Sequence, residues 1–137
     1  MKINDVLDWL TIADEDLYAA KILNEQIRRP FEIICYHCSQ AAEKYLKGYL
    51  AYVDVIAPKT HNLTLLLDLC IENHIEFKNI RTECGILNKF TNEIRYPYRF
   101  EITDEDVLYS INAVEIIKNT KPVKELIDFI TKETKKE

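Results

Sequence analysis

The stretch from Ile34 to Tyr52 constrains the fold more than any other part of the sequence. It contains no proline and a single glycine. On a helix turning about 100° per residue, six of its residues share an arc about 80° wide. These six residues are Ile34, Cys38, Ala41, Tyr45, Gly48 and Tyr52. The spacing therefore predicts one long helix with a continuous buried face.

The rest of the chain repeats this helical spacing. The 137 residues include two glycines and four prolines, fewer turn-forming residues than a β-rich protein normally needs. Apolar residues at helical intervals predict helices at residues 4–26, 30–55, 62–72, 78–93, 104–119 and from Pro122 onward. We therefore expect an all-α, up-and-down helical bundle of four main helices, one short helix and a C-terminal helix. Residues 1–131 would form one domain, followed by a charged tail at 132–137.

The sequence also predicts the roles of four single residues. Asn4 and Thr103 are expected to cap the helices that follow them. Leu108 is expected to be buried with the apolar face of the helix at 104–119. Gly48 costs a helix about 1 kcal/mol relative to alanine, so we expect another helix to pack closely against it.

Charge and hydropathy exclude two classes of function. The formal net charge of −5 argues against binding nucleic acid through bulk positive charge. Any anion site must then be a local cluster of cations on an acidic molecule. No apolar run reaches the length of a membrane span, and the start of the chain does not read as a signal peptide. We expect a cytoplasmic protein with reduced cysteines and no membrane association.

Cys35 and Cys38 have the C-x-x-C spacing of zinc and redox sites, and His37 lies between them. A zinc site would need a second pair of ligands at comparable spacing, which Cys70 and Cys84 do not supply. Because the first pair also lies in an apolar helical run, we expect the thiols to belong to the core. We expect no metal and no cofactor.

Polar residues form a row beside the apolar face of the helix at 30–55. His37, Gln40, Lys44 and Lys47 occupy an arc of their own, also about 80° wide. Side chains in this position can lay their stems on apolar surface and present their heads to a cleft. The row is either the border of a solvated face or a surface directed at an anion.

Two other segments could complete an anion site. His61 lies at the start of the third predicted helix, and Arg95, Tyr96 and Arg99 lie in a short loop between two long helices. Arginine suits phosphate geometrically, and a tyrosine ring can stack on a base. We therefore expect nucleotide or phosphate binding by His37, Gln40, Lys44, Lys47, His61, Arg95, Tyr96 and Arg99.

Three segments together resemble a known family. They are Y-H-C-S-Q-A-A-E-K-Y-L-K at 36–47, T-H-N-L at 60–63 and R-Y-P at 95–97. The chain resembles the HEPN domain (higher eukaryotes and prokaryotes nucleotide-binding) over about residues 4 to 130. The resemblance implies an all-α bundle that usually forms a homodimer, with nucleotide binding in some members. It also implies, for many members, a minimal nucleotidyltransferase partner in a toxin–antitoxin-like pair.

Many HEPN proteins are ribonucleases that use an arginine followed four to six residues later by a histidine. Arg95 stands where this arginine is expected, but positions 100 to 102 hold Phe, Glu and Ile. We therefore assign no catalytic residue and lean against an enzyme. A ribonuclease of this sequence would need His37 or His61 as the proton acceptor and Arg95 as the cation at the developing oxyanion.

Three functions stay open from the sequence. The first is a nucleotide- or RNA-binding module, a homodimer acting with a nucleotidyltransferase partner in a toxin–antitoxin-like system. The second is a metal-independent ribonuclease with a non-standard His/Arg constellation. The third is a non-catalytic protein-interaction scaffold, in which the cations of the row pair with acids such as Glu43 or Glu93. The partners of Lys44 and Arg95 distinguish the third function from the others.

Overall fold

The computed structural model describes residues 2–91 and 101–136, which form six α-helices and one 3₁₀-helix. In chain order these are α1 (Ile3–Asn24), α2 (Phe31–Tyr52), α3 (Leu63–Asn73), the 3₁₀-helix η1 (Ile75–Ile80), α4 (Arg81–Asn88), α5 (Asp104–Asn119) and α6 (Lys121–Lys135). No strand occurs within the described residues, and the all-α prediction is confirmed. None of the helices found there is long and apolar enough to cross a membrane.

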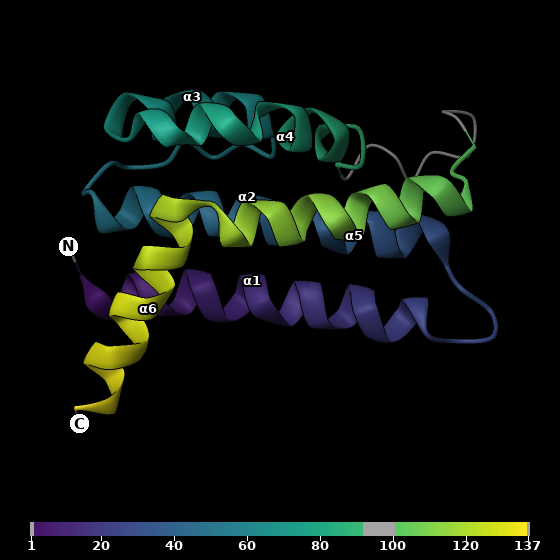
Figure 1. Cartoon of the computed structure of the whole chain (residues 1–137), viewed down its shortest axis with the longest axis horizontal. Helices are drawn as coiled ribbons and strands as arrows, with labels where there is room; N and C mark the ends of the chain where they lie inside the picture. The colour runs from purple at the N-terminus through teal and green to yellow at the C-terminus, as the bar shows by residue number, and fades with distance from the viewer. Residues whose placement is uncertain (1, 92–100, 137) are drawn as a thin grey trace.

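α2 is the central helix of the bundle, because it packs against each of the other five α-helices. Figure 1 shows α1 below it, α3 and α4 above it, and α5 in front of it. α6 crosses the bundle near the N-terminal end of α1. The predicted apolar face of α2 is confirmed, since five of its six residues are buried and Tyr52 is partly buried. Burial extends beyond that face to Ser39, Gln40 and Glu43.

Gly48 allows α1 and α2 to approach each other closely. A Cβ atom at this position would lie 3.1 Å from Leu10 Cδ2 and 3.3 Å from Trp9 Cβ. The predicted close packing at Gly48 is therefore confirmed. The buried residues of α1 are Val6, Leu10, Ala13, Leu17 and Ala20.

Asp14 of α1 joins three helices through its carboxylate. The hydroxyl of Tyr45, which is fully buried in α2, donates a hydrogen bond to it. Lys118 of α5 lies 3.1 Å from the same carboxylate. Burial, and then the hydrogen bond to Asp14, raise the pKa of Tyr45. The phenol therefore stays protonated and holds α1 against α2 as a donor.

Two predicted helix starts are capped by side chains. The side chain of Asn62 accepts the backbone N–H groups of Thr64 and Leu65 at the start of α3. Thr103 accepts the N–H of Asp106, and the Asp106 carboxylate accepts the N–H of Thr103. This reciprocal capping box fixes the start of α5 and confirms the role expected for Thr103.

Other helix ends differ from the prediction. Asn4 is not a cap, because α1 begins at Ile3 with Lys2 as its N-cap. The helix expected at 78–93 is shorter and is preceded by η1, whose first turn is capped by His74 Nδ1. The charged residues from 132 onward, expected as a tail, continue α6 as far as Lys135.

The expected burial of Leu108 is wrong, since this side chain is 53% exposed. α5 buries a narrower face than its apolar residues suggested, at positions three and four residues apart. Its members are Val107, Ser110, Ala113, Val114 and Ile117. Ser110 is tolerated in this face because its hydroxyl lies 3.5 Å from Cys35 Sγ.

The two glycines of the chain provide a matched test of the α1–α2 contact. Gly85 in α4 has open space around its missing side chain, so Gly85→Ala should raise the free energy of unfolding by about 1 kcal/mol through helix propensity. In Gly48→Ala, crowding against Leu10 should cancel this gain in the free energy of unfolding. Gly48→Val should lower the free energy of unfolding by about 1–3 kcal/mol. Urea denaturation followed by circular dichroism measures all three. A Gly48→Val protein as stable as the wild type would contradict the contact.

Candidate functional site

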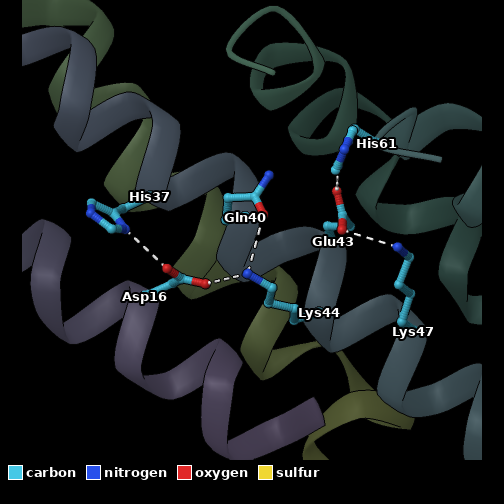
Figure 2. Close-up of polar contacts among 7 residues, drawn as sticks. All are labelled: Asp16, His37, Gln40, Glu43, Lys44, Lys47 and His61. Atoms are coloured by element: carbon cyan, nitrogen blue, oxygen red, sulfur yellow. Dashed lines mark hydrogen bonds and ion pairs between the residues drawn. The ribbon is translucent and has the colours of Figure 1, made fainter. Parts of the chain in front are cut away.

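The polar row of α2 is divided between two clusters, each built around a carboxylate (Figure 2). The Asp16 cluster consists of Asp16 from α1 with His37, Gln40 and Lys44 from α2. The Glu43 cluster consists of Glu43 and Lys47 from α2 with His61 from the loop before α3.

The Asp16 cluster connects α1 to α2. Asp16 Oδ1 lies 2.9 Å from His37 Nδ1, and Asp16 Oδ2 accepts a hydrogen bond from Lys44 Nζ at 2.9 Å. Lys44 also donates to Gln40 Oε1 at 3.1 Å. The buried Nε2 of Gln40 has no partner within the described residues. The Asp16 side chain is 14% exposed and that of Lys44 is 18% exposed, so this pair is screened less by water than a surface ion pair.

The Glu43 cluster connects α2 to the start of α3. Glu43 Oε1 lies 2.7 Å from His61 Nδ1, and Glu43 Oε2 accepts from Lys47 Nζ at 3.1 Å. Lys47 Nζ also lies 5.6 Å from the centre of the Trp9 ring, within range of a cation–π contact. Glu43 belongs to the 36–47 segment and His61 to the T-H-N-L segment, so this contact joins two of the three segments that resemble the family.

Each histidine is held in the same way. An ionised carboxylate can only accept hydrogen bonds, so Nδ1 of His37 and of His61 carries the proton that faces the acid. Nε2 of each ring is then left without a role in the cluster. In Figure 2 the Nδ1 edge of each ring faces Asp16 or Glu43. The side chains of His37 and His61 are 29% and 50% exposed, so solvent or a ligand can reach these rings.

Lys44 and Lys47 do not form a positively charged patch. Lys44 is offset by Asp16 and Lys47 by Glu43, each through a direct ion pair. The net charge of the two clusters therefore depends on the two imidazoles. It is zero when both rings are neutral and becomes positive when either ring takes up a proton.

Five of the eight predicted site residues lie in these clusters. Arg95, Tyr96 and Arg99 lie outside the described residues, so a contact between them and α2 stays a prediction. Asp16 was missed by the sequence analysis. Its position in the sequence could have identified it, because it lies three residues after Ala13 and four before Ala20, at the edge of the buried face of α1.

The four cysteines are free and buried, as predicted. Burial raises the pKa of the Cys35 thiol to about 11 and that of Cys84 to about 12. It raises the pKa of Cys38 and Cys70 as well. These thiols stay protonated near neutral pH, which disfavours thiolate chemistry. Across the described part of the chain, no three His, Cys, Asp or Glu side chains are arranged to hold a metal ion.

Comparisons with known proteins agree on the architecture. The family model for the HEPN domain matches residues 6–127. The crystal structure of an archaeal HEPN homologue is similar to this chain, with a TM-score of 0.66 and 23% sequence identity. The similarity covers 91% of this chain and 97% of the other, and at this identity it shows the fold. A search of curated proteins gave no match.

The Asp16 cluster should contribute measurably to stability. Asp16→Ala would leave Lys44 with Gln40 as its remaining partner and should lower the free energy of unfolding by about 1–3 kcal/mol. Glu15→Ala, one residue away on the exposed side of α1, should change it by less than about 0.5 kcal/mol. Denaturant unfolding of both variants tests the difference. Equal stabilities for the two variants would mean that the ion pairs of Asp16 contribute nothing net.

Proposed function

The chain belongs to the HEPN domain family, a family of nucleotide-binding helical modules, and from this membership we propose that it binds a phosphate group of a nucleotide or of RNA. The proposed site is the face of α2 that carries the Asp16 and Glu43 clusters. The observation that supports it best is the pair of histidines. Each is fixed by a carboxylate through Nδ1, and each keeps Nε2 for a ligand.

The imidazoles, rather than the lysines alone, would bind the phosphate. A ring whose Nδ1–H is already donated to a carboxylate can take up a proton and donate Nε2–H to a phosphate oxygen. Lys44 and Lys47 keep Asp16 and Glu43 from repelling the anion, since each neutralises one carboxylate. Gln40 positions Lys44 by accepting one of its hydrogen bonds.

Arg95 and Arg99 would add the fixed positive charge that the clusters lack. The segment that contains them follows α4 and precedes α5, and both helices pack against α2. Arginine would bind the phosphate in a bidentate manner, and Tyr96 would stack on a base.

The assembly is also part of the proposal. We expect a homodimer that acts with a nucleotidyltransferase partner in a toxin–antitoxin-like system. The support for this expectation is the family, whose members commonly dimerise.

Isothermal titration with ATP, GTP and a short single-stranded RNA tests the binding site. We expect saturable binding of at least one of these ligands. His37→Gln and Arg95→Ala should each weaken it about tenfold or more, because charge-assisted hydrogen bonds are lost. Arg81→Ala is the matched control, since Arg81 is exposed and pairs with Asp68. Absence of heat with all three ligands, or equal losses in Arg81→Ala and Arg95→Ala, would refute the site.

A ribonuclease is the second candidate, and the contact between His37 and Asp16 favours it. A carboxylate that orients an imidazole through Nδ1 leaves Nε2 placed as a general base. In that reaction Nε2 takes the proton of a 2′-hydroxyl, the 2′-oxygen bonds to phosphorus, and the bond to the 5′-oxygen breaks. The 5′-oxygen leaves with a proton from solvent. Arg95 would stabilise the charge that develops on the phosphate.

Incubation of labelled RNA in EDTA tests this second candidate. Cleavage should yield a 2′,3′-cyclic phosphate end and should fall at least 100-fold in His37→Ala, in the range expected for loss of a general base. His74→Ala is the control, because His74 caps η1 and belongs to neither cluster. Cleavage that is equal in the wild type and His37→Ala would identify a contaminating nuclease.

A further inference from the structure

A groove with a volume of about 630 Å³ lies beside the first half of α1 and is separate from the Asp16 cluster. Its walls are the N-terminal half of α1, the last turns of α2 and the loop that follows α2. Neither the two clusters nor the proposed phosphate site accounts for this groove. Lys47 belongs both to its wall and to the Glu43 cluster.

The groove has apolar walls that no other part of the described chain covers. Trp9 is half-buried, Ile12 is 42% exposed and Ile56 is 95% exposed. A contiguous set of exposed large apolar residues is typical of a binding surface.

The end of α2 holds Ile56 in place. Asp54 adopts a left-handed conformation with φ of 60°, and Val55 N–H donates to Leu50 O at 2.9 Å. Asp54 N–H also donates to Ala51 O at 3.2 Å. This pair of hydrogen bonds is a Schellman motif, which fixes the direction in which the chain leaves a helix. The loop therefore presents Ile56 to solvent through an ordered turn.

Carboxylates border these apolar walls. Asp5 and Asp8 line the groove and are exposed, and neither makes a side-chain ion pair within the described residues. Lys47, on the opposite wall, is already neutralised by Glu43. Lys2 and Asp54 also line the groove, so its charged residues are three aspartates and two lysines. Because Glu43 already neutralises one of these lysines, the border is acidic, on a protein whose formal net charge is −5.

From these features we propose that the groove is a docking site for a basic amphipathic helix of a partner protein. The apolar side chains of such a helix would cover Trp9, Ile12 and Ile56, and its lysines or arginines would face Asp5 and Asp8. Nucleotides fit poorly, because the bordering carboxylates repel phosphate. A second copy of the chain also fits poorly, because it would bring another net charge of −5 toward an acidic border.

Trp9 makes the proposal directly measurable, because it is the single tryptophan of the chain. The probe is a 14-residue Leu/Lys peptide without aromatic residues, with leucine at helical spacing. Binding should shift Trp9 emission to shorter wavelength in a saturable way and should weaken as salt is added. Peptides of the same pattern with glutamate in place of lysine, or of the same composition without helical spacing, should cause no shift.

Variants distinguish the contribution of the groove to peptide binding from that of the protein's overall negative charge. Asp5→Asn combined with Asp8→Asn should raise the Kd of the peptide about threefold or more, and Ile56→Ser should raise it similarly. The matched control combines Glu72→Gln with Glu125→Gln, which removes two exposed acids outside the groove and should leave Kd within twofold.

Three results would overturn the proposal. They are an unchanged Trp9 emission with the Leu/Lys peptide, equal losses in the two double variants, and equal binding of the glutamate peptide. Sedimentation of the wild type and Ile56→Ser adds a fourth. A dimer that becomes a monomer in Ile56→Ser would show that a second copy covers the groove.

Discussion

Placing a helix with charged residues at the centre of a bundle requires a partner for each charge. α2 contacts all five other α-helices, and Glu43 keeps 4% of its surface exposed. An isolated carboxylate at such a site would cost several kcal/mol, whereas a paired and hydrogen-bonded one is tolerated. Lys47 and His61 provide that pairing for Glu43, and Lys44 and His37 provide it for Asp16. The position of α2 thus explains both clusters.

The same pairing prepares the histidines for a function. A carboxylate that needs a donor fixes the imidazole through Nδ1 and thereby selects the tautomer with a free Nε2. The Nδ1 edge of each ring therefore stabilises the fold, and the Nε2 edge is available to a ligand. This arrangement explains how His61 can brace the start of α3 and still be half exposed.

Much of the fold could be predicted from local patterns. The buried faces of α1 and α2, the capping box at Thr103 and the close approach at Gly48 follow from the spacing of residues along single helices. Leu108 and Asp16 could not be placed in this way, because their surroundings depend on how a helix is rotated against its neighbours. Within the site, the sequence identified residues of α2 and His61. It missed Asp16, the carboxylate that gives two of them their orientation.

The close approach of α1 and α2 at Gly48 also affects contacts that these helices make elsewhere. Since Gly48 admits the side chain of Leu10 and the Cβ of Trp9 at one level of α2, sliding of the two helices along each other would lose this fit. A slip of one helical turn, about 5.4 Å, would carry Asp16 out of reach of both His37 and Lys44. The missing side chain at position 48 therefore determines which acid on α1 meets which base on α2.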